Sequence, residues 1–280
     1  MPGRTSRDGL KLVVDCANGA AYRTAPDTLY ELGAEIVPLA VSPDGFNINE
    51  NCGAVHPQVM AAAVVAHGAD AGICLDGDAD RLIMADETGK IIDGDQILGC
   101  LALAMQERGT LANNAVVGTV MTNRGLEARL GKAGIDLHRV AVGDRYIVEK
   151  MRQDELNLGG EPSGHMLMTD LARSGDGLLT ALQMLTLLKS SGKKASTLFN
   201  SFSPHPQRLE NLRGIDPAIL QDKKLQSDLG NIETNLNGKG RVLVRPSGTE
   251  ALVRVMVEAE TDALVTEAMD ALILRITAEA

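Results

Sequence analysis

An acidic loop directly follows a short apolar segment in the first third of the sequence. The apolar run 71–75 leads into Asp76-Gly-Asp-Ala-Asp-Arg81, so carboxylates stand at every second position. Side chains alternate along an extended backbone, and carboxylates spaced by two therefore project to the same side. Carboxylates gathered so closely raise one another's pKa unless a cation binds between them, and Mg²⁺ prefers carboxylate, water and phosphate oxygens. The loop predicts a Mg²⁺ site at Asp76, Asp78 and Asp80, with Arg81 as a bidentate donor to phosphate.

The acidic loop has two other interpretations. The first is a solvated turn, because Asp and Gly are ordinary turn residues. Asp-Gly-Asp after a strand also resembles the loop of aspartyl-phosphate phosphatases, in which Asp76 would be the nucleophile and Asp78 the acid. That motif expects Thr or Val where this sequence has Asp80. The third carboxylate therefore argues against a phosphatase.

A second loop combines an acceptor, a hydroxyl and an imidazole between glycines. In Gly160-Glu-Pro-Ser-Gly-His165, the side chains of Glu161, Ser163 and His165 alternate. Such a trio suits the vicinal hydroxyls of a sugar, and Glu161 can also accept a hydrogen bond from an amino group. The alternative is a surface turn with a capping serine.

A third loop has the composition of a phosphate cradle. Arg245 ends a predicted strand and is followed by Pro-Ser247-Gly248-Thr249-Glu250. Two hydroxyls, a glycine that allows close backbone approach and an arginine can surround a phosphate. Arg254, on the following strand, can reach the same anion. A plain β-hairpin loop is the alternative.

Arg145 is a candidate for a further phosphate contact. It lies in the first turn of a predicted helix, within Val142-Gly-Asp-Arg-Tyr146. Free backbone N–H groups at a helix start favour anions.

The elements that position these loops follow an alternating pattern of strands and helices. In the first part, strands are predicted at 10–15, 34–41 and 71–75, with helices at 20–32 and 57–67. In the second part, strands are predicted at 115–121, 135–142 and 156–158, with helices at 94–108, 124–132, 144–153 and 177–188. Gly159-Gly160 is predicted to open a polar loop. After Ser203, strands at 241–245 and 251–257 precede a helix at 261–277. This alternation predicts sheets of mostly parallel strands with helices on their faces.

Composition excludes several classes of protein. The chain has 27 basic and 37 acidic residues, a formal net charge of −10, which argues against nucleic acid or an anionic membrane surface as a partner. Four cysteines without a CxxC pair favour free thiols in a reducing compartment. No signal peptide and no apolar run long enough to span a membrane is found, so the cytoplasm is the expected location.

Taken in order, the loops resemble those of the α-D-phosphohexomutases, from about Leu10 to the end of the chain. The resemblance implies that Mg²⁺ binds Asp76, Asp78 and Asp80, and that Arg81 lies near the transferring phosphate as a catalytic residue. It implies that Glu161 and Ser163 contact the sugar, with His165 in the same loop. It also implies that the phosphate that does not react is held by Arg245, Ser247, Gly248, Thr249 and Arg254.

The same resemblance implies the architecture and the substrate. Two consecutive three-layer α/β domains with mixed, mostly parallel sheets are expected at 1–93 and 94–202, followed by a small phosphate-binding α+β domain at 203–280. The segments Asp15–Tyr22, Pro43–Asn49 and Val142–Tyr146 resemble the bacterial branch that interconverts glucosamine 6-phosphate and glucosamine 1-phosphate for cell-wall precursors. The phosphorylated partner is then an amino sugar, with glucose or mannose phosphates as alternatives.

The sequence departs from the family at the nucleophile. Members of the family carry an additional N-terminal domain, in which a Thr-x-Ser-His-Asn-Pro-type loop holds a phosphoserine. Ser-His-Asn-Pro is absent from these 280 residues, and neither Ser163 nor Ser174 stands in a matching motif. The chain is therefore expected to lack the phosphoserine domain, to need it as a partner, and to be inactive alone. The general acid and base stay unassigned, and a phosphosugar-binding module without catalysis is the alternative.

Overall fold

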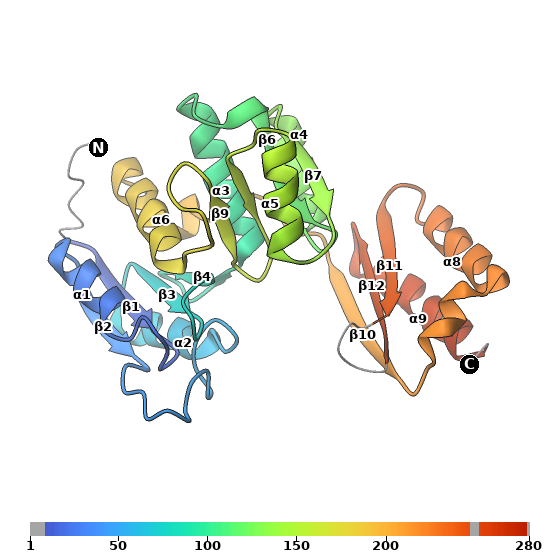
Figure 1. The fold of residues 1–280 in the computed structure, drawn as a ribbon, viewed down its shortest axis with the longest axis horizontal. Coiled ribbons are helices and arrows are strands. Elements are labelled where there is room, and N and C mark those ends of the chain that lie inside the picture. Colours follow the sequence, from blue (N-terminus) through green and yellow to red (C-terminus); the bar gives the residue numbers. More distant parts are fainter. Residues whose placement is uncertain (1–8, 247–251, 279–280) are drawn as a thin grey trace. The chain divides into compact units, whose positions relative to one another are not determined.

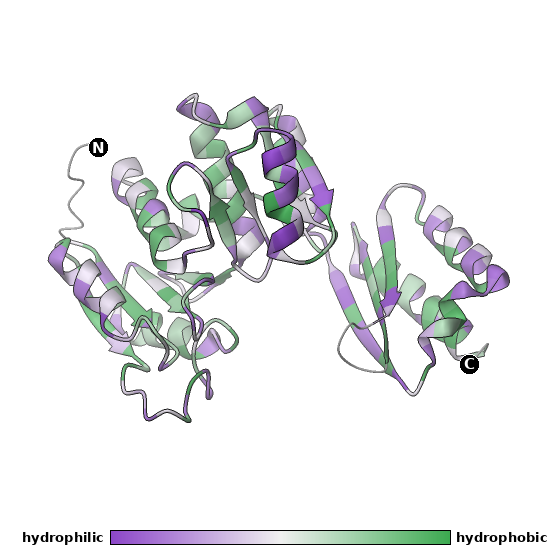
Figure 2. Ribbon diagram, in the orientation of Figure 1, coloured by the Kyte–Doolittle hydropathy of each residue, from purple (hydrophilic) through white to green (hydrophobic). Residues whose placement is uncertain are grey.

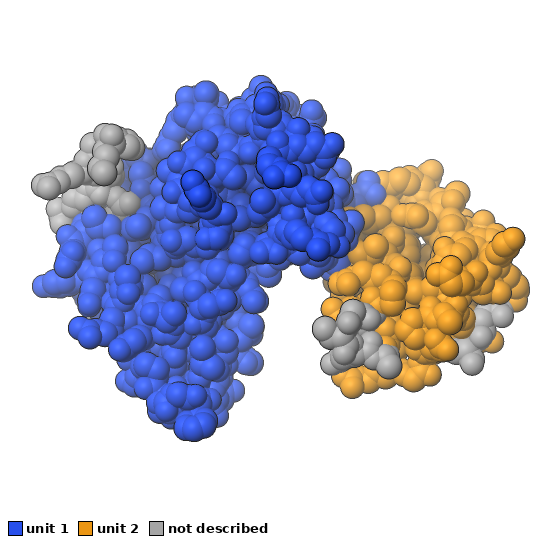
Figure 3. All heavy atoms as spheres, viewed as in Figure 1, with its two compact units in different colours: residues 1–203 blue, residues 204–280 orange. Residues whose placement is uncertain are grey.

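The computed structural model describes residues 9–246 and 252–278 (Figure 1). The chain divides into two compact units, residues 1–203 and residues 204–280 (Figure 3). Each unit is described by itself. None of the helices in the described ranges is both long and apolar enough to cross a bilayer.

The first sheet of residues 1–203 has the strand order β2-β1-β3-β4-β5. In this sheet β4 alone runs against the other strands. Successive residues of β1 face opposite sides: Val13 packs with Met60 of α2, and Leu12 packs with Leu29 of α1. Helices therefore cover both faces of the sheet, which explains why its central strands are apolar throughout. The elements are β1 (Lys11–Asp15), α1 (Thr24–Glu31), β2 (Glu35–Leu39), α2 (Gln58–His67), β3 (Ala71–Leu75), β4 (Leu82–Asp86) and β5 (Ile91–Ile92).

The second sheet has the strand order β7-β6-β8-β9, and β9 alone runs against the other strands. The helix α5 is largely hydrophilic (Figure 2). It buries Ile147 and Met151 against one face of the sheet, and α3 and α4 cover the other. The elements are α3 (Gly94–Glu107), η1 (Ala112–Asn114), β6 (Ala115–Thr119), α4 (Arg124–Lys132), β7 (Asp136–Val140), α5 (Asp144–Gln153), β8 (Leu158–Gly160) and β9 (Met166–Met168).

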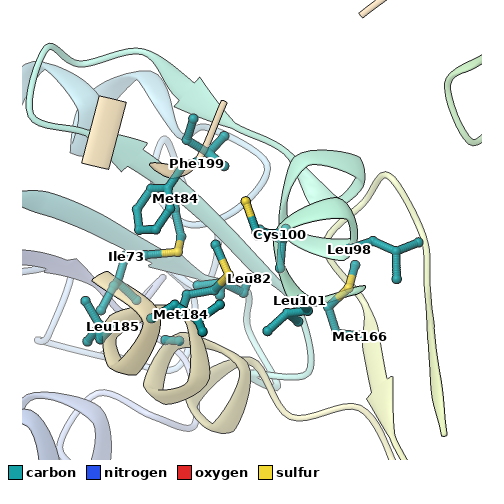
Figure 4. Close-up of a cluster of buried hydrophobic side chains, with 14 of the residues drawn as sticks. Ile73, Leu82, Met84, Leu98, Cys100, Leu101, Met166, Met184, Leu185 and Phe199 are labelled. Carbon is teal, nitrogen blue, oxygen red and sulfur yellow. The ribbon is translucent and has the colours of Figure 1, made fainter. Parts of the chain in front are cut away.

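One hydrophobic core joins the two sheets of residues 1–203. The helix α6 (Gly177–Ser191) packs on β3 and β4 as well as on α3, and α7 (Ala195–Leu198) packs on β4. Figure 4 shows Leu82 and Met84 of β4 close to Met184 of α6. Phe199, directly after α7, has no solvent exposure within this cluster.

Residues 204–280 have their own core beside an antiparallel sheet of order β10-β12-β11. The central strand β12 packs on α9, and α9 packs in turn on α8. The elements are β10 (Gln207–Arg213), η2 (Pro217–Gln221), α8 (Lys223–Asn235), β11 (Gly240–Pro246), β12 (Leu252–Ala259) and α9 (Asp262–Ala278). The predicted fold class is confirmed: two helix-covered mixed sheets precede a smaller α+β part.

One local prediction was wrong. Gly159 and Gly160 do not open a loop but form most of β8, and the predicted strand at 156–158 is displaced toward them. The reason is close packing, since a Cβ at Gly159 would lie 2.7 Å from Ile147 Cγ2 and 2.9 Å from Met151 Sδ. Glycine is needed here because α5 lies so near the strand.

Candidate active site

The acidic loop connects the antiparallel strands β3 and β4, so its two ends lie side by side. One oxygen of each of Asp76, Asp78 and Asp80 lies within 4.8 Å of the others. Asp76 is buried, Asp80 is partly buried, and Asp78 is exposed. The predicted convergence of the three carboxylates on one side of the loop is therefore present in the structure.

Arg81 is the counter-ion of this cluster. Its Nε lies 3.0 Å from Asp76 Oδ2 and 3.5 Å from Asp80 Oδ1, and its backbone N–H donates to Asp76 Oδ1 at 3.1 Å. Burial raises the pKa of Asp76, and the backbone N–H of Arg81 opposes that rise. The carboxylates of Asp80 and Asp78 raise this pKa further, while the guanidinium of Arg81 lowers it.

The donor set fits a hard divalent cation. Its atoms are carboxylate oxygens, which Mg²⁺ and Ca²⁺ prefer. In the described part of the chain, Asp80 Oδ1 is buried and accepts no hydrogen bond. A bound cation would satisfy that oxygen and would relieve the repulsion between the carboxylates.

The loop from Gly160 to His165 is the turn between β8 and β9. The backbone N–H of Glu161 donates to His165 O at 3.0 Å, and the N–H of Gly164 donates to Glu161 O at 3.0 Å. Ser163 Oγ donates to Glu161 Oε2 at 3.1 Å. Ser163 is exposed, so Glu161 and Ser163 present a carboxylate and a hydroxyl together at the surface of the hairpin.

His165 links this hairpin to the acidic loop. Its ring is buried, and its Nδ1 lies 3.1 Å from Asp80 Oδ2. The backbones of Arg81 and His165 also form an antiparallel bridge, and Leu82 N–H donates to Gly164 O at 3.1 Å. The structure thus brings together two loops that stand about 80 residues apart in the sequence.

A third loop, at the start of α5, contacts the β8–β9 hairpin. The backbone N–H of Gly143 donates to Glu161 Oε1 at 2.9 Å. Two residues later, Arg145 is exposed, with its guanidinium 4.7 Å from the ring centre of Tyr146 and its Nη2 donating to Tyr146 Oη. Sequence reasoning placed Arg145 near an anion but missed the backbone contact of Gly143, which no side-chain pattern signals.

The remaining candidate cations belong to residues 204–280. The register of β11 and β12 places Arg245 directly opposite Arg254. Within the described residues, Arg254 Nε is buried and has no hydrogen-bond partner. Two arginines opposite each other repel, so this pair is suited to an anion. Ser247, Gly248 and Thr249 connect the two strands and lie outside the described residues.

Comparison with protein families matches almost the whole chain. Models of the phosphoglucomutase/phosphomannomutase family fit three consecutive segments: alpha/beta/alpha domain II at residues 3–89, alpha/beta/alpha domain III at 93–205, and the C-terminal domain at 207–275. The chain belongs to this family. Its acidic loop lies in the segment matched by domain II, and its β8–β9 hairpin lies in the segment matched by domain III.

Relatives in the family share about half of the residues. The phosphoglucosamine mutase of Roseobacter denitrificans is 54% identical over 273 residues, which cover 97% of this chain and 61% of the relative. That of Paracoccus denitrificans is 53% identical over 272 residues, which cover 96% and 60%. The chain therefore spans about 60% of the length of the curated relatives that it matches.

Solved structures of the family have the same fold. A phosphoglucomutase/phosphomannomutase family protein from Burkholderia thailandensis superposes with a TM-score of 0.82 at 27% identity, covering 96% of this chain and 60% of that chain. The N-acetylphosphoglucosamine mutase of Aspergillus fumigatus, solved with GlcNAc-6P and magnesium, gives 0.76 at 21% identity, covering 98% and 63%.

Proposed function

We propose that this chain carries the metal-, sugar- and phosphate-binding loops of a phosphoglucosamine mutase, which interconverts glucosamine 6-phosphate and glucosamine 1-phosphate. The observation that carries the proposal is the contact between the acidic loop and the β8–β9 hairpin, in which His165 Nδ1 lies 3.1 Å from Asp80 Oδ2. This contact supports the proposal because it joins the loop proposed to bind the cation to the loop proposed to bind the sugar, in a chain 54% identical to a protein of that name.

In this proposal Asp76, Asp78 and Asp80 hold Mg²⁺. The ion, when bound, neutralises charge on the phosphoryl group that is transferred. Arg81 uses Nε on the carboxylates, so its terminal nitrogens are left to donate to the same phosphoryl group. His165 holds Asp80 in place, and Glu161 stays fixed by Gly143 while it accepts hydrogen bonds from the sugar.

The other end of the substrate is assigned to residues 204–280. Arg245 and Arg254 neutralise the phosphate that does not react, together with Ser247, Gly248 and Thr249. Arg145 adds a cation at the start of α5. The three-domain division at 1–93, 94–202 and 203–280 is part of this proposal, as is the cytoplasmic location, which suits free buried cysteines.

The nucleophile of the proposed reaction is a phosphoserine that is not among these 280 residues. Its phosphoryl group passes to the free hydroxyl of the sugar phosphate, giving a bisphosphate. The phosphoryl group at the other position then returns to the serine. Phosphate is conserved over the cycle, so water must be excluded and no inorganic phosphate is released.

The proposal is tested with the 280-residue chain and with a chimera that joins it to the N-terminal segment of the Roseobacter denitrificans relative. Both are given glucosamine 6-phosphate, Mg²⁺ and a catalytic amount of glucosamine 1,6-bisphosphate. The chain alone should bind glucosamine 6-phosphate in calorimetry without converting it, and the chimera should form glucosamine 1-phosphate. Glucose and mannose phosphates should react more slowly.

Three outcomes would contradict the proposal. Conversion by the chain alone would show that its nucleophile lies within the 280 residues. Binding without turnover by a folded chimera would indicate a phosphosugar-binding module. Release of inorganic phosphate that Asp76→Asn abolishes would indicate a phosphatase.

A further inference from the structure

Asp15 is a carboxylate without solvent exposure at the carboxyl end of β1, the strand next to β3. Its Oδ1 accepts the backbone N–H of Ala17 at 2.9 Å, and its Oδ2 accepts that of Gly53 at 3.1 Å. Both donors lie in turns with positive φ, 55° at Ala17 and 75° at Gly53. A buried carboxylate requires donors of this kind, and here they come from two separate loops. One side chain therefore fixes both loops.

The first of these loops, residues 16–20, contacts the acidic loop directly. The backbone N–H of Ala20 donates to Gly77 O at 2.8 Å. Gly19 packs so closely that a Cβ there would lie 2.3 Å from Gly77 O. Because Gly77 stands between Asp76 and Asp78, this contact sets the backbone that carries the carboxylates.

The second loop, residues 47–54, holds the acidic loop from another side. Its Ala54 N–H donates to Leu75 O at 3.0 Å. A Cβ at Gly77 would lie 2.6 Å from Ile48 Cδ1 and 3.0 Å from Asn49 Nδ2. The two loops are also bonded to each other, because Asn49 N–H donates to Ala17 O at 2.9 Å. Gly77 is thus held between them.

We propose that Asp15 is a positioning residue for the metal site. It acts through the two loops, which keep the backbone at Gly77 in the shape in which the three carboxylates meet. This inference rests on the proposed function, since it takes Asp76, Asp78 and Asp80 as metal ligands. It gives a role to Asp15–Tyr22 and to Pro43–Asn49, two segments to which the proposed reaction assigns no direct contact.

The test compares metal binding by the 280-residue chain and its Asp15→Asn variant. Asparagine keeps the shape but replaces one acceptor oxygen by a donor, so the N–H of Ala17 or of Gly53 loses its partner. Free Mn²⁺ is counted by electron paramagnetic resonance, with Mg²⁺ as competitor. Groups that orient metal ligands typically change metal affinity 10- to 100-fold. We expect the dissociation constant to rise about tenfold or more, with an unchanged circular dichroism spectrum.

Asp86→Asn is the matched control. Asp86 is also buried and anchors a turn, accepting from Thr88 N at 2.9 Å and from Lys90 N at 3.1 Å. It pairs with Ala71, at the end of β3 remote from the acidic loop. The control should leave Mn²⁺ affinity unchanged, which separates positioning by Asp15 from the mere replacement of a buried carboxylate.

If Asp15→Asn fails to fold, a second pair of variants tests the same proposal. Gly19→Ala introduces a methyl group against Gly77 O, whereas Gly131→Ala, in α4, adds one where no described atom beyond the neighbouring residues and backbone of its own helix lies within 4 Å. Only the first should weaken Mn²⁺ binding. Affinities of Asp15→Asn and Gly19→Ala equal to that of the unchanged chain would overturn the inference and leave the proposed function standing. Absence of Mn²⁺ and Mg²⁺ binding by the unchanged chain would overturn the metal site itself.

Discussion

Arg81 is expected to have two opposite effects: its charge competes with a metal ion for the carboxylates, and its donors assist the ion in binding a phosphoryl group. Its Nε lies 3.0 Å from Asp76 Oδ2, so the guanidinium partly neutralises the carboxylates before a cation arrives. In the proposed metal site the carboxylates of this loop also bind the cation. Arg81 is then expected to compete with the cation electrostatically, while its remaining donors suit the phosphoryl group of a substrate.

Arg81→Gln should consequently separate metal binding from catalysis. Mn²⁺ affinity of the 280-residue chain should stay the same or increase, because a competing positive charge is removed. Turnover by the chimera should fall by about 10²- to 10³-fold, the usual effect of removing a donor to developing charge. Paramagnetic resonance and steady-state rates measure the two quantities. A loss of metal affinity together with unchanged turnover would contradict this assignment.

The cysteine thiols give a prediction about pH. Burial raises the pKa of Cys16 and of Cys100 to about 12, and it raises the pKa of Cys52 and Cys74 as well. A raised pKa keeps a thiol protonated, and only the thiolate reacts. At pH 8 a group with a pKa near 12 is roughly one part in ten thousand thiolate. Ellman's reagent should therefore label the native chain at pH 8 very slowly, and should label all four cysteines in denaturant.

The sequence was sufficient for the acidic loop but not for its partners. The alternation of Asp76, Asp78 and Asp80 is a local pattern, so their convergence followed from spacing alone. The contact of His165 with Asp80 depends on a bridge between two sheets, and the contact of Gly143 with Glu161 uses a backbone N–H. Neither contact leaves a local signal in the sequence.

At the scale of elements, helices with clear ends were predicted best. The helix 124–132 was predicted with the bounds that the structure gives, and the side chain of Asn123 caps it by accepting from Gly125 N. The charged segment 207–213 was not predicted as a strand, yet it forms β10 against β12. Its side chains alternate between exposed and partly buried, so pairing with the central strand decides its structure, not its own apolar content.

The β11–β12 pair predicts a conflict between stability and binding. Arg245 faces Arg254 across the two strands, and like charges in this arrangement destabilise a sheet. Arg254→Val should therefore raise the free energy of unfolding of residues 204–280 by roughly 0.5–1 kcal/mol. Phosphate is expected to stabilise the unchanged chain by binding this arginine pair, and the substitution should remove that stabilisation. Thermal unfolding in phosphate and in chloride of equal ionic strength measures both, and unchanged phosphate stabilisation would refute the role of Arg254.

At the scale of the whole molecule, the two separate cores predict two unfolding transitions. Phe199 belongs to the core of residues 1–203, and Met269 belongs to that of residues 204–280; neither has solvent exposure. Phe199→Ala should lower the free energy of unfolding of residues 1–203 by about 3–5 kcal/mol. Met269→Ala should lower that of residues 204–280 by about 2–5 kcal/mol. Differential scanning calorimetry should show one peak shifted in each variant. A shift of both peaks by one substitution would show that the units unfold together.

The hydrogen bonds between the acidic loop and the β8–β9 hairpin also have a mechanical consequence. The Arg81–His165 bridge and the bond from Leu82 N to Gly164 O tie the first sheet to the second. Because backbone hydrogen bonds and a shared hydrophobic core connect the two sheets, bending between them is resisted. The residues proposed to bind the metal and those proposed to bind the sugar should therefore move together as one rigid body. In the proposed reaction, a hinge that lets the substrate turn between two half-reactions is then expected near Ser203 and Pro204, where the two units meet in the sequence.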